Sequence, residues 1–562
     1  MRRCVWSWNV WSDGWGLADG STRIAAVHDI WLSPATGECA AYRVADRPRC
    51  AGGAGVMPPE PSTEVELKFL LLPGEGQAVS RNPLLAGATG TALSSVYYDT
   101  PDLDLRKRGI ALRVRRAHGR YVQTVKREGG TSLFDRGEWE TEIGGPEPDR
   151  AALAGTPAGD IPAAREGSGL RSLFVTEVRR TSRIVREGDD LIEISLDHGE
   201  IVAGDRRASI DELELELKGG EARGLFVLAR RLVGDTRLRL SFESKSERGY
   251  RLAAGEAPAA YNAADVHVTG DMTGAEAFAV VMRNCLAQIC DNANLLRETR
   301  NAEALHQLRV GLRRLRAALA TFEPILPGGE FPRIVAESKW MGSELDAARD
   351  LDILIADQAD AERDDDGIDR GPAMLDERLR VARAASYDRA LAAIDSMRFA
   401  LFVLDCAEWV EIGDWRESRD EEVAALRDGR ASVLAAVALD RLNRKLRKDA
   451  KHLATLDPSA RHHVRIKAKK LRYAAEFFAE AFGKHGKGHR RKFTAALERL
   501  QGALGDLNDL AVSGQTLLAA TGEEDAASVL HAGRKEARLL KKAVRACRDW
   551  RRAKAFWRDR HS

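Results

Sequence analysis

The feature that most constrains this chain is an alternation of charged and apolar residues with a period of two, repeated between residues 64 and 250. The segment EVELKF at residues 64–69 carries a charge at every second position, as do LRVR at 112–115 and ELELELK at 212–218. Successive side chains of a β-strand face opposite sides, so each segment has one charged and one apolar face. The pattern predicts β-strands in this half of the chain.

Two arrangements are compatible with these charged faces. In an ordinary sheet the apolar face packs on the core and the charged face meets water. Here, however, the charges are sorted by sign: residues 64–66 and 212–216 are acidic, whereas Arg113 and Arg115 are basic. A closed antiparallel sheet would collect all of these charges in one lumen, and the sorting favours that arrangement.

A lumen of this kind suits a complex of metal ions with a condensed phosphate. Carboxylate oxygens are preferred ligands of hard cations such as Mg²⁺ and Mn²⁺. Arginine and lysine bind phosphate oxygens, and phosphoryl transfer depends mainly on positioning and charge neutralisation. The sequence contains no P-loop, no HExxH segment, and no pattern that pairs a Cys or Ser nucleophile with His.

The same segments resemble the CYTH family, also called the triphosphate tunnel metalloenzymes. The resemblance begins with ExExK at 64–68 and continues in order through YYDTP at 97–101, LRVR at 112–115, TVK at 124–126, DHG at 197–199, ExExE at 212–216 and SKxxRGY at 244–250. It implies an eight-stranded antiparallel tunnel with flanking helices, within an overall α+β fold class. Members of the family hydrolyse inorganic or organic triphosphates, and some cyclise ATP.

The resemblance also implies roles for individual residues. The expected ligands of Mg²⁺ or Mn²⁺ are Glu64, Glu66, Glu214 and Glu216. Glu212 faces the same side of its strand as Glu214 and could join them. Asp197 is expected either to bind the metal ion itself or to contact one of its ligands. The cations expected to hold phosphate during catalysis are Lys68, Arg113, Arg115, Lys126 and Arg183, with Arg179 and Lys245 as further substrate-binding residues. One metal ion would clamp the triphosphate and a second would activate or orient water, while the general base stays unassigned.

Beyond residue 272 the hydrophobic period changes to 3.6, which predicts an all-helical domain. The segment ALHQLRVGLRRLR at 304–316 is the most informative part of this domain. At 100° per residue, a sector of roughly 80° holds a row of four side chains, namely His306, Arg309, Arg313 and Arg316. Neighbours in such a row lie about 5–6 Å apart, which suits a linear polyanion.

The row occurs a second time, in HHVRIKAKKLR at 462–472, where the equivalent residues are His462, Arg465, Lys469 and Arg472. Downstream, LDAARDL at 345–351 is matched by LGDLNDL at 504–510. Two matched segments in the same order predict an internal duplication and two pseudo-symmetric helical bundles. Like charges at these spacings destabilise a helix by a few tenths of a kcal/mol per pair, so a row kept twice indicates a bound anion.

Other interpretations of these rows remain open. They could be solvated faces neutralised by acidic neighbours, the two histidines could bind a metal ion, and the basic surface could bind nucleic acid. We found no helix-turn-helix or RNA-binding signature that would support the last of these.

The segment HQLRVGLRRLRAAL at 306–319, and the helical half as a whole from about residue 273 to 550, resembles the CHAD domain. Members of that family are associated with inorganic polyphosphate and often follow a CYTH domain on one chain. The second row has Lys469 and Lys470 where the first has arginines, which keeps the charge but loses the bidentate geometry of arginine.

Composition sets further bounds. A chain of 562 residues suits two or three domains. Its 87 basic and 85 acidic residues give a net charge of +2, which argues against a uniformly basic protein that coats nucleic acid. The sequence contains no stretch of about 18 consecutive apolar residues, so it predicts no membrane-spanning helix. The seven cysteines form no CxxC pair, which favours a reducing cytoplasm over a disulfide framework or a zinc ribbon.

We expect four segments along the chain. Residues 1–56 hold five of the eleven tryptophans without periodicity, and are either a disordered extension or the product of a mis-called start, with Met57 as the initiator. Residues 60–252 form the tunnel domain, 253–272 an Ala-, Gly- and Pro-rich linker, and 273–558 the helical domain.

The expected function is metal-dependent hydrolysis of inorganic triphosphate in the tunnel, with polyphosphate binding by the helical domain. The alternatives are an adenylate cyclase or a thiamine triphosphatase, each of which needs a pocket for an organic base, and a non-catalytic polyphosphate-binding scaffold. The oligomeric state is left open.

Overall fold

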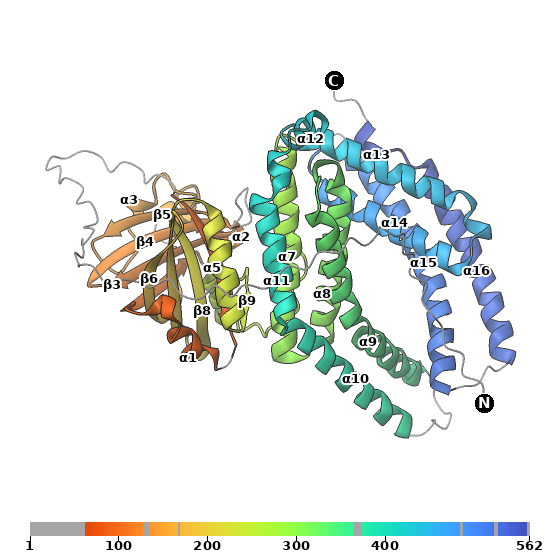
Figure 1. Ribbon diagram of the computed structural model, residues 1–562, viewed down its shortest axis with the longest axis horizontal. Helices are drawn as coiled ribbons and strands as arrows, with labels where there is room; N and C mark the ends of the chain where they lie inside the picture. The colour runs from red at the N-terminus through yellow and green to blue at the C-terminus, as the bar shows by residue number, and fades with distance from the viewer. Residues whose placement is uncertain are drawn as a thin grey trace, which may run out of the picture. The chain divides into compact units, whose positions relative to one another are not determined.

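The computed structural model describes residues 62–72, 74–127, 134–166, 169–364, 373–483, 487–521 and 526–558 (Figure 1). All of these residues belong to a single compact unit. The expected N-terminal extension, residues 1–56, lies outside the described part of the chain. A strand-rich half precedes a helical half, so the predicted α+β class is confirmed.

The strand-rich half forms one antiparallel sheet of nine strands, counted over the described residues: β1 (Ser62–Leu71), β2 (Thr89–Asp99), β3 (Ile110–Ala117), β4 (Arg120–Arg127), β5 (Asp135–Ile143), β6 (Arg171–Glu187), β7 (Asp190–Ala203), β8 (Arg206–Gly219) and β9 (Leu238–Leu240). Their order is β5-β4-β3-β2-β6-β7-β8-β1-β9, and a further pairing of β5 with β1 closes the sheet. Eight strands therefore surround the lumen, as predicted, and the short β9 pairs with β1 outside the ring.

Alternation along β1 and β8 decides which side chains face the lumen. Leu67 and Phe69 are fully buried in the core that lies outside the ring, so Glu66 and Lys68 face inward. The antiparallel register sets Glu66 opposite Glu216 and Lys68 opposite Glu214. Charges that are distant in the sequence thus become neighbours across two strands.

Within the described residues the tunnel strands are accompanied by the α-helices α1 (Glu75–Ser80), α2 (Asp104–Lys107), α3 (Arg150–Leu153), α4 (Pro162–Glu166), α5 (Ala222–Asp235) and α6 (Lys245–Ala254). Helix α5 buries Leu225, Phe226 and Leu232 in the core outside the ring. Helix α6 starts with a capping box in which Ser244 and Glu247 satisfy each other's backbone N–H groups. This cap fixes the direction of Lys245, the first residue of the helix.

The helical half consists of α7 (Gly274–Thr299), α8 (Ala302–Phe322), α9 (Glu330–Asp364), α10 (Ala373–Ile394), α11 (Met397–Ile412), α12 (Glu421–Arg427), α13 (Ala431–Asp449), α14 (Pro458–Phe477), α15 (Lys487–Thr521) and α16 (Ala526–Arg552). Helices α8 and α14, which carry the two cation rows, contact each other. Each is followed by a helix of 35 residues, α9 or α15, as an internal duplication would produce. Within the described ranges, no helix combines the length and the apolar character needed to cross a bilayer.

The expected linker packs against the helical half. The N–H of Tyr261 donates to Asn292 Oδ1 at 3.0 Å, and Asn292 Nδ2 donates to the carbonyl of Tyr261 at 2.9 Å. Val268 is fully buried. The linker is therefore held against α7, and its boundaries stay a prediction.

Candidate functional site

The interior of the tunnel holds a cavity of about 370 Å³. Both signs of charge line it in nearly equal number: the basic residues Lys68, Arg113, Arg115, Lys126, Arg180, Lys218 and Lys245 and the acidic residues Glu66, Glu138, Glu140, Glu193, Asp197, Glu214 and Glu216. They come from β1, β3–β8 and the start of α6. The inward charges predicted from the strand alternation thus share one cavity.

A network of ion pairs around Lys245 forms part of the cavity lining. Its Nζ lies 2.6 Å from oxygens of Glu212 and of Glu214, and 3.0 Å from Asp197 Oδ2. Arg180 donates from Nε and Nη2 to the two oxygens of Asp197, each at 2.7 Å, and also contacts Glu214. With Arg248, which lies 2.6 Å from Glu212, three cations and three carboxylates neutralise one another with little exposure to water.

The pKa values within this network show which charges are stabilised. Burial alone would raise the pKa of Glu214, but Lys245 and Arg180 hold that pKa well below its usual value. Burial likewise opposes the charged form of Lys245, yet the neighbouring carboxylates raise its pKa above the ordinary range. Both groups stay charged near neutral pH.

Arg113 and Arg115 lie two residues apart on β3 but differ in their partners. Arg113 Nη2 is 3.4 Å from Glu138 Oε1, which also lies 3.2 Å from Lys126 Nζ. Among the described residues Arg115 makes no ion pair, and its buried Nε has no hydrogen-bond acceptor. Burial, together with the charges of Arg113 and Arg180, lowers the pKa of Arg115 to about 10. Arg115 is thus the cation in this cavity that most lacks a counter-charge.

Carboxylates gather on the opposite wall, where β1, β7 and β8 adjoin. Glu66 is 8% exposed and faces Glu216 across the β1–β8 pair. Lys218 Nζ lies 2.5 Å from Glu216 and 3.2 Å from Glu193. No group of three or more His, Cys, Asp or Glu side chains with metal-binding geometry occurs among the side chains that the structure describes. Glu64 belongs to β1, but its side chain lies outside that set.

The donor set nevertheless fits a hard divalent cation. Glu66, Glu214 and Glu216 present carboxylate oxygens to one cavity, and oxygen ligands are what Mg²⁺ and Mn²⁺ prefer. Glu212 fits less well, because its oxygens contact Arg248 at 2.6 Å and Lys245 at 2.6 Å and it does not line the cavity. Asp197 also lines the cavity and is engaged by Arg180 and Lys245, as Glu214 is, so both carboxylates position these two cations as well as offering oxygen ligands.

Two expected cations lie elsewhere. Arg179 is exposed on the outer side of β6, and Arg183 is exposed and donates to the carbonyl of Ala86. The inward residues of β6 are Thr176, Val178 and Arg180, so the strand parity is opposite to the one that we expected. Adjacent arginines at 179 and 180 make either parity plausible from the sequence, and the structure corrects the choice to Arg180.

Other lumen residues were absent from the predicted site. Glu138 and Glu140 alternate in the segment EWET at 138–141, which was a usable signal. Glu193 lies in LIEIS at 191–195, where a single charge among apolar residues is only a weak signal of a lumen position. Lys218 is the last residue of the otherwise acidic segment ELELELK.

The first cation row lies on α8 and is partly neutralised. Arg309 forms an ion pair with Asp346 of α9, and Arg316 donates to the carbonyl of Ser338 at 2.9 Å. Burial and nearby arginines lower the pKa of Arg313, whose buried Nε has no acceptor among the described residues. Burial, with Arg349 and the row itself, also lowers the pKa of His306. The row is therefore short of negative charge at its centre.

The second row lies on α14. His462 Nδ1 is 2.6 Å from Asn508 Oδ1, and Arg472 donates to Gln501 at 2.9 Å and pairs with Glu476. The buried Nε of Arg465 has no acceptor within the described ranges. Arg465 lies close enough to Arg313 to lower the pKa of that residue, so the centres of the two rows adjoin. Lys469 lies on the same helix between Arg465 and Arg472.

Comparison with known proteins gives two family matches. Residues 62–250 match the family model described as the CYTH domain, and residues 280–518 match the CHAD domain. An inorganic triphosphatase of Haemophilus influenzae is 32% identical over 199 residues, which cover 34% of this chain and 55% of that protein. The chain therefore spans about half the length of this curated relative.

Solved structures resemble each half. The CHAD domain from the plant Ricinus communis is 28% identical and covers 54% of this chain and 98% of its own, with a TM-score of 0.41. A Hippeastrum protein described as a putative adenylyl cyclase with a dominant triphosphatase activity is 20% identical. The match covers 35% of this chain and 97% of that protein, with a TM-score of 0.27.

Proposed function

Because the chain carries a CYTH domain at residues 62–250 followed by a CHAD domain at 280–518, we propose that its tunnel hydrolyses inorganic triphosphate with Mg²⁺ or Mn²⁺ and that its helical domain binds longer polyphosphate. The family match and the curated relative support triphosphate hydrolysis at the level of the family. The observation that carries the proposal for this chain is the state of Arg115, a buried guanidinium that lies beside two other guanidiniums and forms no ion pair with any carboxylate that the structure describes.

A triphosphate supplies the charge that this wall of the tunnel lacks. Its oxygens would accept from Arg115 and Arg113, with Lys126 completing the cationic wall and Lys68 donating from β1 on the facing wall. Arg180 and Lys245 already hold carboxylates, so in this scheme they fix the floor of the site. They leave the cations of β3 and β4 for the substrate.

Divalent metal ions would be held on the carboxylate wall by Glu66, Glu214 and Glu216, with Glu64 as a further candidate on the same strand. When bound, such ions neutralise phosphate oxygens and activate or orient water. The cation and carboxylate walls face the same cavity, so a triphosphate would lie between arginines on one side and carboxylates on the other. This arrangement orients the phosphoanhydride bond and shields it from bulk water.

The lining favours an inorganic substrate over a nucleotide or thiamine triphosphate. Among the described residues that line the cavity, the apolar ones are Leu93, Ala117, Val178 and Tyr97, and the ring of Tyr97 is already stacked on Phe174. A purine or thiamine ring would need a larger apolar surface than these side chains offer.

Glu66→Gln tests the metal assignment. We expect the Mg²⁺ concentration that gives half-maximal turnover of tripolyphosphate to rise at least about tenfold, since changing even a partner of a metal ligand typically costs about 10–100-fold in affinity. Phosphate release would be measured across a Mg²⁺ titration, and polyphosphate binding by the full chain should be unchanged.

Glu142→Gln is the matched control, because Glu142 is exposed on β5 and pairs with Arg120 outside the cavity. An unchanged Mg²⁺ requirement in Glu66→Gln would refute the assignment of this residue as a ligand.

Polyphosphate binding by the helical domain is supported by the adjoining centres of the two cation rows, where Arg313 and Arg465 each keep a buried Nε without an acceptor in the described part of the chain. A linear polyanion that lies along α8 and α14 would satisfy both rows together. His306 and His462 are the first residues of the two rows, on α8 and α14.

The double variant Arg309→Gln/Arg465→Gln is expected to weaken polyphosphate binding by at least about tenfold, because two charge-assisted contacts are lost. The difference from the wild type should shrink as salt rises, since screening weakens exposed charge pairs. Affinity would be measured by titration of the full chain at several salt concentrations.

Arg300→Gln/Arg419→Gln removes the same charge from exposed positions that belong to neither row and serves as the control. Equal affinities of the two double variants would show that the rows are ordinary surface.

A further inference from the structure

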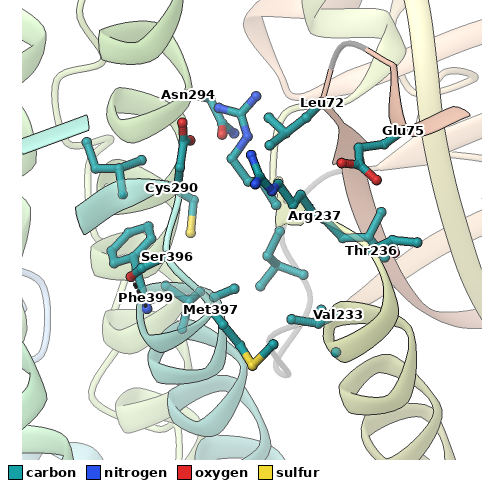
Figure 2. Close-up of a pocket in the computed structure, with 18 of the residues that line it drawn as sticks. Leu72, Glu75, Val233, Thr236, Arg237, Cys290, Asn294, Ser396, Met397 and Phe399 are labelled. Carbon is teal, nitrogen blue, oxygen red and sulfur yellow. Dashed lines mark hydrogen bonds between the residues drawn. The ribbon is translucent and has the colours of Figure 1, made fainter. Parts of the chain in front are cut away.

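A second charged cavity lies between the tunnel domain and the helical domain. It has a volume of about 710 Å³, and its walls come from the end of α5 and β9 on one side and from α7, α10 and α11 on the other. Figure 2 shows Leu72, Glu75, Val233 and Thr236 on one wall facing Cys290 and Asn294 on the other. A neighbouring cavity of about 1050 Å³ shares Leu72, Arg239 and Asn294 with it.

The tunnel domain contributes Arg239 to the place where the two cavities meet. Arg239 is the middle residue of β9, between Leu238 and Leu240, which are buried in the core. Strand alternation therefore turns its side chain away from that core and toward the helices. Its Nε and Nη1 are buried and have no hydrogen-bond acceptor among the described residues.

The carboxylates near Arg239 do not supply the missing acceptor. Asp395 is held by Arg297, whose Nε lies 3.0 and 3.1 Å from its two oxygens. Glu298 lines the neighbouring cavity without a hydrogen bond to Arg239. Burial, together with the charge of Arg297, lowers the pKa of Arg239 to about 10. The positive charge of Arg239 is thus only partly compensated.

The helical domain contributes Asn294, on α7. This side chain is 7% exposed, and its Nδ2 has no acceptor within the described ranges. It lines both cavities, as Arg239 does. A buried donor without an acceptor lowers the stability of the folded protein. A ligand with several acceptor oxygens would satisfy two nitrogens of Arg239 and one of Asn294 together.

We propose that Arg239 and Asn294 form a binding site for a phosphate-type oxyanion between the tunnel domain and the helical domain. Such an anion offers several acceptor oxygens and the negative charge that Arg239 lacks. The site is separate from the tunnel cavity, because neither residue lines that cavity.

A bound anion would link the two domains. One set of its contacts is to β9, which pairs with β1 of the tunnel, and the other is to α7 of the helical domain. Occupancy would therefore stabilise the contact between the domains. If the protein hydrolyses triphosphate as proposed, it releases phosphate, which would be the natural ligand of this site. Only the identification of released phosphate as that ligand rests on the proposed function.

The test is amide hydrogen exchange of the full chain during a titration with inorganic phosphate, with chloride at matched ionic strength as the reference. In the wild type, exchange in residues 236–242 and 288–298 is expected to slow by the factor 1 + [phosphate]/Kd, about tenfold when phosphate is at roughly nine times Kd. Arg239→Gln and, separately, Asn294→Leu should remove this slowing.

Arg237→Gln is the matched control, because Arg237 lines the same cavity but is exposed. It should leave the slowing in place. Protection of residues 110–117 in the tunnel reports on the proposed function and should survive in Arg239→Gln.

No slowing at 236–242 and 288–298 in the wild type would overturn the inference, whatever happens in the tunnel. Equal slowing in Arg239→Gln would also overturn it. Equal protection by acetate at the same concentration would overturn the assignment to a phosphate-type anion. Slowing at these two segments without any turnover of tripolyphosphate would support this site and refute the proposed function.

Discussion

Replacing Lys245 with methionine is expected to lower the free energy of unfolding by about 3–5 kcal/mol. Methionine keeps the apolar stem but removes the charge that lies within 3.0 Å of Asp197, Glu212 and Glu214. Three buried carboxylates then depend on Arg180, on Arg248 and on the charge of Lys68. Leaving a buried charge uncompensated costs more than the original ion pair contributed.

The effect of Lys245→Met should depend on pH. The pKa values of Glu212 and Glu214 are lowered in the folded protein, so their contribution to stability is present above the ordinary carboxyl pKa of about 4.3 and is lost as pH falls through the lowered values. The difference between wild type and variant should be largest near neutral pH and shrink in acid. Denaturant unfolding at several pH values would measure it.

Lys218→Met is the control for this comparison. Lys218 also contacts two carboxylates, but its side chain is 36% exposed, so the expected cost is only about 0–1 kcal/mol. Equal costs for the two variants would contradict the view that the Lys245 network is shielded from water.

Arg115→Gln is expected to lower kcat for tripolyphosphate by about 100- to 1,000-fold, the usual effect of removing one preorganised donor from developing negative charge. The same change should leave stability unchanged or increase it, because it relieves repulsion from Arg113 and Arg180 without breaking an ion pair. A loss of activity together with retained stability distinguishes a residue that binds substrate from one that supports the fold.

Arg116→Gln removes the same charge from the exposed side of β3. Its kcat should stay within about twofold of the wild type. If Arg115→Gln were as active as Arg116→Gln, the role of Arg115 in holding phosphate would be refuted.

The sequence predicts the walls of the tunnel well and its ion pairs poorly. Alternation in EVELKF, LRVR and ELELELK is enough to assign the inward faces of β1, β3 and β8, since a strand has only two faces. The partners of those side chains depend on register and closure. That Glu138 lies between Arg113 and Lys126 follows from β3, β4 and β5 pairing in one register, which no local pattern specifies.

The sequence also does not determine which side chains of β6 face the lumen. This strand has adjacent arginines at 179 and 180, so the charge pattern fits either face, and only the packing of Phe174 and Val178 decides that Arg180 points inward. The site at Arg239 and Asn294 was not predictable for a further reason. It exists only where β9 meets α7, and the alternation of Arg239 with Leu238 and Leu240 does not specify which helix that strand meets.

The most direct test of the account is phosphate release by the purified full chain from tripolyphosphate, ATP and thiamine triphosphate, each with and without Mg²⁺. A tunnel in which Arg115 and its neighbouring cations face a wall of carboxylates predicts release that requires the divalent ion and is fastest from tripolyphosphate. Equal or faster release from ATP or thiamine triphosphate, release that persists without the metal, or no release from any of the three would contradict it.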